Sequence, residues 1–519
     1  MEGPIPEGAA DESGRHAVRA FCDAVTALSR ANADTPVWWY TWLSSRDRFN
    51  SGLFDVFLGA PVDRRPTAYR GHGFIPLAKE VAAAIESRIV AWLCPARAID
   101  DAGVILVAPA TPEALGSGNR PYRDTYFGAL METLRARGER PLLIGLPVGH
   151  RRRTVRALAR RGDIPAASVA HHLRLGDIAA AAWRSLTTTL DGAAVRLPDG
   201  TDATPFVAGE LGLERRSMFQ GLLVERAMAR VLARHPRARV IHTYENNPWE
   251  RAVDRAAHRA TPRRDVIGYL HCAVLPSHLK NFKAPEEDGI RPSPDRIVCT
   301  GPAAREVFLG LGAHDPARVL AGCALRGPAL SALAPRRAPA ERIRTVLAVL
   351  EGLKSMTSLL QFLAAAAPAG DRRILIRAHP VMPLDVLLPA AGVSLDPARG
   401  LGASRAPGLV DAIAEAQAVI YQSSTAAMTA LAMGVPLVKV RLPGPLEDDP
   451  LFACNALKRA IERPDQLQAA LDAFEGMPQA TFEAERARAH DYLDSYLAPA
   501  NDAGLACFAG PDGWNAAAR

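Results

Sequence analysis

The sequence lacks several features that would place it at once in a class of protein. Only six of its 62 basic residues are lysine, and no Cys-x-x-Cys pair is present, which argues against a zinc ribbon or a dithiol redox site. No run approaches the ~18 consecutive apolar residues of a membrane span. Residues 1–15 also lack the basic start and apolar run of a secretory signal. We therefore expect a soluble protein that stays in the cytoplasm.

Short catalytic and nucleotide-binding motifs are missing as well. There is no P-loop, no Gly-x-Ser-x-Gly, no His-Glu-x-x-His and no Gly-x-Gly-x-x-Gly after a strand. The seven cysteines lie far apart, mostly in apolar surroundings, so we expect reduced thiols and no metal site. The formal charge of +7 is carried by arginine in a manner typical of a GC-rich genome. It suits an anionic ligand or an acidic membrane face, and we expect no nucleic-acid partner.

Two series of alternating strands and helices fill most of the 519 residues. An amphipathic helix is predicted over 14–31, and the aromatic-rich stretch 35–58 is predicted to join the first core. Apolar runs of strand length begin at 103 and recur to about 301, and a second series starts at 343 beyond a Pro- and Ala-rich boundary. This predicts an α/β chain with four parts: a helical segment (1–34), a Rossmann-like acceptor-binding domain (35–326), a Rossmann-like nucleotide-sugar-binding domain (327–478), and a C-terminal helix and tail (479–519).

A long polar loop over 110–125 and a polar turn near 422 both follow predicted strands. In an open α/β sheet, ligands collect at the carboxyl ends of strands, so the loop is a candidate acceptor-binding element. After the second strand, a helix of small residues follows the turn Gln422, Ser423, Ser424 and Thr425. These hydroxyls can simply cap the helix, or they can hold a phosphate together with its free N–H groups. We favour the nucleotide-binding role.

The segment 374–381 presents a histidine at another strand end. Pro380 stops the strand and biases His379 toward an extended backbone, so the imidazole is held at the strand end rather than within the sheet. A histidine there can contact a phosphate and help the nucleotide leave; a structural histidine is the alternative. We predict that His379 is catalytic and that Arg377 and the turn 422–425 share one anion pocket with it.

Glu245 is the conspicuous carboxylate of the first half. It follows a predicted strand over 238–246, where it can take a proton from an acceptor hydroxyl across an interdomain cleft. We predict Glu245 as the catalytic base and Glu210 as its rival; Glu250 is expected in the first turn of the next helix as a dipole partner. A structural role for Glu245, capping the turn at Trp249, is the alternative.

His271 and the basic run at 150–162 each have two interpretations. His271 ends a predicted strand and either contacts the donor across the cleft or packs against Tyr269. The basic run forms one helical face, which is expected to be solvated, with attraction to anionic lipid as the alternative.

The chain resembles bacterial surface carbohydrate biosynthesis proteins of O-antigen and capsule loci in several short motifs. These are Tyr-Glu-Asn-Asn-Pro-Trp-Glu (244–250), Gly-Tyr-Leu-His (268–271), Pro-Asp-Arg-Ile (294–297) with Gly301, Arg-Ala-His-Pro (377–380) and Gln-Ser-Ser-Thr (422–425). The stretch 122–128 also fits, and the similarity covers roughly 35–475 as scattered motifs. This resemblance implies a GT-B glycosyltransferase, in which two Rossmann-like domains face each other and a C-terminal helix crosses between them, with His271 and Gly301 among the donor-binding residues.

More distantly, the His-Pro and Ser-Ser pair is similar to that of bacterial sialyltransferases and Kdo transferases. That similarity implies a CMP-linked 3-deoxy ulosonic acid as donor, with His379 and Ser423–Thr425 at the CMP phosphate. The run Glu-Glu-Asp-Gly at 286–289 resembles the acidic motif of some sialyltransferases, but its polar, proline-flanked setting favours a coincidence in a surface loop.

We therefore expect a cytoplasmic, metal-independent glycosyltransferase that needs no cofactor. Its partners would be a nucleotide-sugar donor and a glycan or glycolipid acceptor in surface polysaccharide or lipopolysaccharide synthesis, with peripheral contact with the inner membrane left open. A nucleotide-sugar epimerase or hydrolase of the same fold is one alternative. A non-catalytic assembly protein is another.

Overall fold

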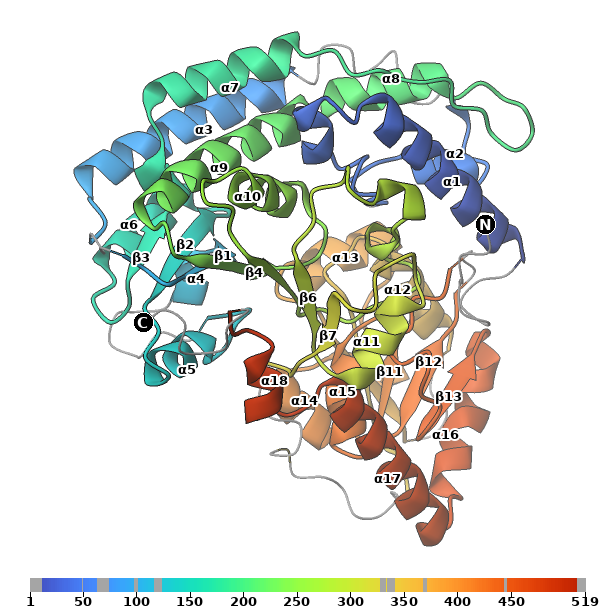
Figure 1. The fold of residues 1–519 in the computed structure, drawn as a ribbon. Coiled ribbons are helices and arrows are strands. Elements are labelled where there is room, and N and C mark those ends of the chain that lie inside the picture. Colours follow the sequence, from blue (N-terminus) through green and yellow to red (C-terminus); the bar gives the residue numbers. More distant parts are fainter. Residues whose placement is uncertain are drawn as a thin grey trace.

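Two parallel sheets, each covered by helices, form the body of the protein (Figure 1). The computed structural model describes residues 12–48, 50–62, 74–97, 101–115, 124–326, 333, 341–366, 371–442 and 446–510. The sheet strands of the first domain lie between Val104 and Ala321, and those of the second lie between Thr345 and Ile461. The predicted boundary at 327 itself falls outside the described residues.

The first sheet has the strand order β3-β2-β1-β4-β5-β6-β7, and all its neighbours run parallel. Its central strands β4 and β5 are buried along their whole length because helices cover both faces of the sheet. The order reverses between β1 and β4, which is the topological switch point of this sheet. The strands are β1 (Val104–Ala110), β2 (Pro141–Pro147), β3 (Ala166–Ser168), β4 (Arg239–Thr243), β5 (Val266–Leu270), β6 (Arg296–Cys299) and β7 (Val319–Ala321).

The helices of the first domain include a thick outer layer. Helices α3 and α7 pack on α9, and α9 packs on α10. The set comprises α1 (Glu12–Ala31), η1 (Pro36–Tyr40), α2 (Leu53–Phe57), α3 (Phe74–Leu93), α4 (Pro112–Leu115), α5 (Leu130–Ala136), α6 (Arg151–Arg160), η3 (Val169–His172), α7 (Leu175–Thr187), α8 (Thr204–Leu213), α9 (Arg215–Arg234), α10 (Pro248–His258), η4 (Leu279–Asn281), η5 (Pro285–Glu287) and α11 (Pro302–Leu309).

The predicted N-terminal helix and aromatic core are confirmed. Helix α1 buries Val18, Phe21, Val25 and Leu28, and the cluster that they join includes Trp38, Trp39, Phe54 and Phe57. Of the long loop predicted over 110–125, residues 116–123 lie outside the described residues. Helix α5 starts only at Leu130, because Asp124 and Gly128 first close a tight turn by pairing with each other.

The second sheet has the order β10-β9-β8-β11-β12-β13 and is also parallel throughout. Its switch point lies between β8 and β11. The strands are β8 (Thr345–Val349), β9 (Arg373–Arg377), β10 (Leu401–Ala403), β11 (Ala418–Tyr421), β12 (Leu437–Val440) and β13 (Lys458–Ile461). The helices are α12 (Met356–Ala365), α13 (Leu384–Ala391), η7 (Pro397–Arg399), α14 (Leu409–Glu415), α15 (Ala426–Ala432), η8 (Pro464–Gln466), α16 (Leu467–Glu475), α17 (Gln479–Tyr496) and α18 (Asp502–Ala506).

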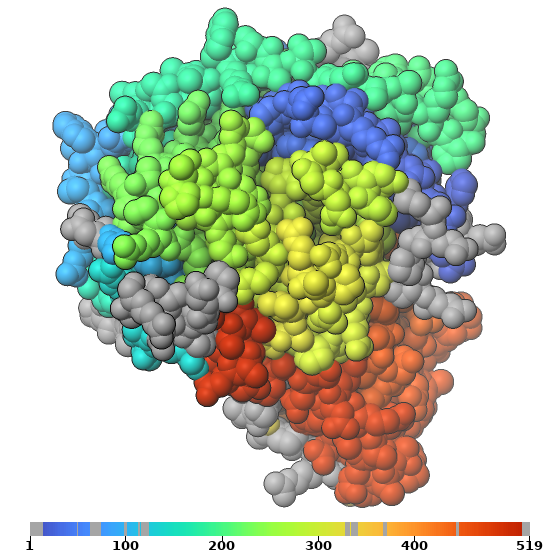
Figure 2. Space-filling view, in the orientation of Figure 1, coloured from blue at the N-terminus to red at the C-terminus, as the bar shows by residue number. Residues whose placement is uncertain are grey.

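The C-terminal helix α17 leaves the second domain and returns the chain to the first. At its end, the Tyr496 carbonyl accepts a hydrogen bond from Thr300 Oγ1 at 2.8 Å, and the Tyr496 hydroxyl accepts one from the Val274 amide at 2.8 Å. Figure 2 shows this last part of the chain, in red, against both the first domain and the rest of the second. One apolar cluster also joins Leu270 and Phe308 of the first domain to Leu493 of α17. Two facing Rossmann-like domains with a crossover helix confirm the predicted GT-B architecture.

All seven cysteines are free thiols, as predicted. Within the described ranges, no helix combines the length and apolar character that a bilayer crossing requires.

Candidate active site

A cavity of about 690 Å³ lies between the two domains. Its walls come from the strand ends of both sheets and from the end of the crossover helix. The first domain contributes His271, Cys272, His278 and Thr300, the second contributes Glu351, Ser423 and Thr425, and the crossover segment contributes Asp494 and Tyr496. A cleft with wall residues from both domains is a place where a ligand can be held.

The second-domain wall stands at the switch point of its sheet. Glu351 follows β8, Ser423 follows β11, and these strands are neighbours with opposite onward connections. A hydrogen bond joins Ser423 to Glu351; it lowers the pKa of that carboxyl, but burial dominates and raises it overall. The crevice between two such strand ends is where open α/β sheets bind ligands. Hydroxyl, amide and carboxyl groups here can bind the hydroxyl and phosphate groups of a nucleotide sugar.

The turn at 422–425 divides its groups between the cavity and the fold. Ser423 and Thr425 line the cavity, while Ser424 Oγ accepts from the Ala426 amide at 3.4 Å. Gln422 donates from Nε2 to Asp448 at 3.1 Å, and its carbonyl accepts from the buried Lys439 at 2.5 Å. Gln422 and Ser424 therefore shape the turn, and Ser423 and Thr425 are the members of the turn that line the cavity.

The tip of β9 does not meet this turn directly, because β8 lies between β9 and β11. His379 is exposed, and its Nδ1 accepts from the Val381 amide at 3.2 Å. Arg377 donates from Nη1 to the Ala406 carbonyl at 2.8 Å. The imidazole lies against Gly352, where an added Cβ would be 2.9 Å from its Nδ1. The two predicted tips both contact the loop after β8, at Gly352 and Glu351, and neither Arg377 nor His379 is among the residues that line the cavity.

The first-domain wall centres on a cluster around Glu245. Its Oε2 accepts from Lys280 Nζ at 2.8 Å, and its Oε1 lies 3.3 Å from His271 Nε2. The thiol of Cys272 donates to the same Oε1 at 3.3 Å. Tyr126 packs edge-on against the His271 ring at 5.0 Å. The strand ends of β4 and β5, together with the loop after β5, thus bring these groups to one place.

The pKa values of Glu245 and His271 show which of the two is the stronger base. Burial opposes the charge of Glu245, but the charge of Lys280 and its hydrogen bond to the carboxylate outweigh burial and hold the pKa of Glu245 at about 2. Burial lowers the pKa of His271 to about 4, with Glu245 opposing, and it raises the pKa of the Cys272 thiol. At neutral pH the cluster holds a carboxylate, a neutral imidazole and a thiol. His271 is the stronger base of the two and is the one that lines the cavity.

Glu245, His271 and Cys272 are also the one group of metal-ligating side chains found together in the described part of the chain. Their ligand atoms all lie within 4.8 Å of one another. Lys280 already neutralises the carboxylate, so an added cation would meet a positive neighbour. Metal independence stays a prediction.

Other predicted residues serve the fold around the site. Glu250 caps α10 as expected: it is buried and accepts from the amides of Glu245 at 2.9 Å and Asn247 at 2.8 Å. Glu210 is not placed as a rival base, because it is buried in α8 and accepts from the Gly52 amide at 2.9 Å. Gly301 lies against the crossover helix, where an added Cβ would be 2.3 Å from the Ser495 carbonyl oxygen.

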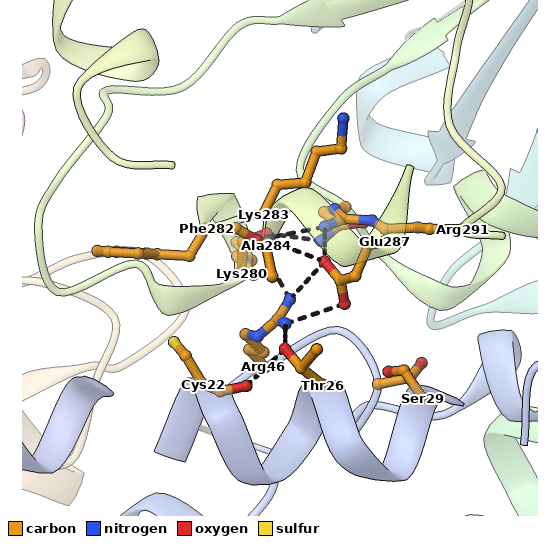
Figure 3. A network of polar contacts seen from close by, with 12 residues as sticks. Cys22, Thr26, Ser29, Arg46, Lys280, Phe282, Lys283, Ala284, Glu287 and Arg291 are labelled. Carbon is orange, nitrogen blue, oxygen red and sulfur yellow. Dashed lines mark hydrogen bonds and ion pairs between the residues drawn. The ribbon is translucent and has the colours of Figure 1, made fainter. Parts of the chain in front are cut away.

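A buried ion network anchors the loop that supplies the first-domain wall (Figure 3). Glu287, expected in a surface loop, is buried, and that interpretation of 286–289 was wrong for this residue. Its carboxylate accepts from both terminal nitrogens of Arg46, at 2.9 and 3.1 Å, and pairs with Arg291 at 3.3 Å. Arg46 also donates to Thr26 of α1 at 3.1 Å. The loop with Lys280 is thereby tied to the N-terminal helix.

Glu351 is the site residue that the sequence interpretation missed. It lies two residues after the end of the buried strand β8 and precedes Gly352. A carboxylate at the end of an apolar strand is the same signal that pointed to Glu245, so it was available in the sequence. His278 was not predicted as a site residue either; it lines the cavity, and burial lowers its pKa to about 4.

No protein-family model matches the chain. No curated protein matches it either. Among solved structures it is similar to CalG4, the calicheamicin glycosyltransferase, with 15% identity over 76% of this chain and 94% of that one and a TM-score of 0.41. It is also similar to UDP-GlcNAc 2-epimerase from Neisseria meningitidis (10%, 76% and 96%, TM-score 0.43) and to MurG from Acinetobacter baumannii (13%, 77% and 97%, TM-score 0.41). At these identities and TM-scores the similarity assigns no activity.

Proposed function

We propose that the chain is a glycosyltransferase that binds a nucleotide-sugar donor in the cavity between its domains. One observation supports this most: the cavity meets the switch point of the second sheet on one side and a histidine–carboxylate pair of the first domain on the other. Glu351, Ser423 and Thr425 would bind the nucleotide and its sugar, and the acceptor would approach from the His271 side.

The proposed reaction needs one proton acceptor near the acceptor hydroxyl. His271, neutral at pH 7, takes that proton as the acceptor oxygen bonds to the anomeric carbon and the bond from that carbon to the phosphate oxygen breaks. Glu245, 3.3 Å away, stabilises the imidazolium that forms. The nucleotide leaves with the electron pair of the broken bond. This assigns the base to His271 with Glu245 as its positioning residue, and the catalytic role of His379 stays a prediction.

The finer identity of the substrates follows the sequence resemblance. It favours a CMP-linked 3-deoxy ulosonic acid as donor and a glycan or glycolipid of surface polysaccharide or lipopolysaccharide as acceptor. The reaction as written requires no metal and takes place in the cytoplasm. A nucleotide-sugar epimerase or hydrolase would use the same cavity without an acceptor and is the second candidate.

The test is nucleotide release from CMP-, UDP-, GDP- and CDP-sugars, with and without glycan acceptors. A transferase releases nucleotide in step with glycosylated acceptor. A hydrolase, or an epimerase that also hydrolyses its substrate, releases nucleotide and free sugar without an acceptor, and an epimerase that does not hydrolyse returns the epimeric nucleotide sugar. Ser423→Ala should weaken donor binding by roughly 2- to 13-fold, since one hydrogen bond is worth about 0.5–1.5 kcal/mol. Ser358→Ala, an exposed residue of α12 outside the cavity, is the matched control. Failure of every donor to bind or react would refute the proposal.

A further inference from the structure

Helix α3 carries large apolar side chains out to solvent along one face. Ile75, Ile85, Ile89 and Trp92 are all exposed, and Trp92 is 72% exposed. Their spacing places them within about a third of the helix circumference, opposite the face that buries Leu77 and packs into the domain. Scattered apolar residues on a surface are ordinary, but a continuous stripe of this kind marks an interaction site.

Helix α7 extends this surface. It packs beside α3 and exposes Leu175, Trp183 and Leu186 on a single face, with Trp183 at 69%. Figure 1 shows both helices at the outer side of the first domain, away from the second domain, and neither helix contributes a residue to the cavity wall. We call the exposed apolar residues of these two helices the α3–α7 face.

A row of arginines lies on the neighbouring helix α6. Helix α6 packs against α3 and exposes Arg153, Arg156 and Arg160 on one side. These three positions lie within one helical face, opposite the buried Val155 and Leu158.

The acidic residues of α3 and α7 are all neutralised by arginine. Glu80 pairs with Arg151 at 2.6 Å and with Arg216 at 2.7 Å. Glu86 pairs with Arg152 of α6, and Asp177 pairs with Arg230. This part of the first domain therefore combines exposed apolar side chains on α3 and α7, exposed arginines on the adjoining helix α6, and no uncompensated acid on α3 or α7.

We propose that the α3–α7 face and the arginines of α6 dock the protein on an anionic lipid membrane. Tryptophan prefers the interface between headgroups and acyl chains, and arginine beside it attracts anionic headgroups. A second copy of the chain fits this surface less well. A two-fold dimer joins identical patches and would bring two rows of arginines into one interface. The surface is separate from the cavity, so this proposal does not depend on the reaction.

Co-sedimentation of the full chain with vesicles tests this directly. Binding is expected to vesicles of phosphatidylcholine with phosphatidylglycerol, and to be weak with phosphatidylcholine alone. Replacing Arg153, Arg156 and Arg160 together by Gln leaves the ion pairs of Glu80 and Glu86 intact. It should weaken binding roughly 100-fold, at about fivefold for each lost charge.

The double variant Trp92→Ala/Trp183→Ala should also lose vesicle binding while unfolding at the temperature of the wild type. Val386→Ala, an exposed apolar residue of α13 in the second domain, is the matched control and should bind normally. The proposal is overturned if the wild type does not bind anionic vesicles. It is also overturned if the triple arginine variant and the double tryptophan variant both bind them as well as the wild type does. A wild-type dimer that the tryptophan variant splits, with no vesicle binding, would assign the surface to a second copy instead.

Discussion

His271 Nε2 lies 3.3 Å from Oε1 of Glu245, and the other oxygen of that carboxylate holds Lys280 at 2.8 Å. The carboxylate thus has two partners from the strand end and loop of β5. Because Lys280 already compensates its charge, Glu245 is a weak proton acceptor in its own right. Its position suits it to orient the imidazole and to stabilise a positive charge there.

Replacing His271 by Asn should remove proton transfer while keeping a polar side chain at the cavity wall. Transfer should then fall in kcat by about 10²–10⁴-fold, with donor binding nearly unchanged in a thermal-shift titration. Glu245→Gln keeps the shape of the side chain and should lower kcat less. Its loss of the ion pair to Lys280 would show separately as a lower unfolding temperature.

The matched control is His258→Asn, because His258 also pairs with a carboxylate, at 3.2 Å from Asp295, outside the cavity. It should leave kcat unchanged. Equal losses in His258→Asn and His271→Asn would mean that the effect at His271 is structural, and the assignment of the base would fall.

Glu287→Gln should destabilise the protein strongly. It leaves the buried Arg46 and Arg291 without their carboxylate, and removing one member of a buried ion pair costs about 3–5 kcal/mol. Denaturant unfolding measures this, and Asp465→Asn in the exposed pair with Arg463 should change stability by less than about 0.5 kcal/mol. A small effect at Glu287 would show that the network contributes little to stability.

The central strands of both sheets could be predicted because they are buried on both faces and read as apolar runs. The edge strands could not. β3 (Ala166–Ser168) and β10 (Leu401–Ala403) are three residues long and are defined by pairing with a neighbour. β13 (Lys458–Ile461) contains two basic residues and lies at the edge of its sheet, where it pairs with β12 on one side. The local sequence pattern does not predict these edge strands, because their pairing depends on the rest of the fold.

The same division holds for the site. Ser423 and Thr425 were found because a buried strand, a polar turn and a helix follow each other within a few residues. Burial of Glu287 could not be inferred, because its partner Arg46 lies 241 residues away in the sequence. The prediction that His379 shares a pocket with the turn depended on strand order, and β8 lies between the two strands. Order in a sheet is a long-range property that strand sequences alone do not specify.

Gly301→Ala should loosen the crossover helix. The new Cβ would lie 2.3 Å from the Ser495 carbonyl oxygen and 3.0 Å from that of Tyr496, so the end of α17 must shift. Overpacking of this kind typically costs about 1–3 kcal/mol, and limited proteolysis should cut near residue 497 sooner. Gly162→Ala, with no atom within 4 Å of the new Cβ, is the control and should resist the protease like the wild type.

His314 offers a pH-dependent test of burial. Its Nε2 lies 2.7 Å from the Asn281 carbonyl oxygen and its ring stacks on Phe308 at 4.1 Å between centroids. Burial lowers its pKa to about 3 from the ordinary value of 6.5. Between these values the unfolded chain binds a proton that the folded protein does not. The contribution of His314 to stability is therefore complete above pH 6.5 and declines as the pH falls toward 3.

His314→Gln should consequently be less stable than the wild type at pH 7.5, and the difference should shrink at lower pH. The expected slope is up to about 1.4 kcal/mol per pH unit below 6.5. Denaturant unfolding of both proteins at pH 7.5 and pH 5 measures it. Glu214 and Glu250, whose pKa values burial raises to about 7, titrate in both proteins and cancel in the difference. If the stability difference between the two proteins stays constant with pH, His314 takes up its proton in the folded protein as it does in the unfolded chain. Its surroundings would then be more polar than the packing on Phe308 implies.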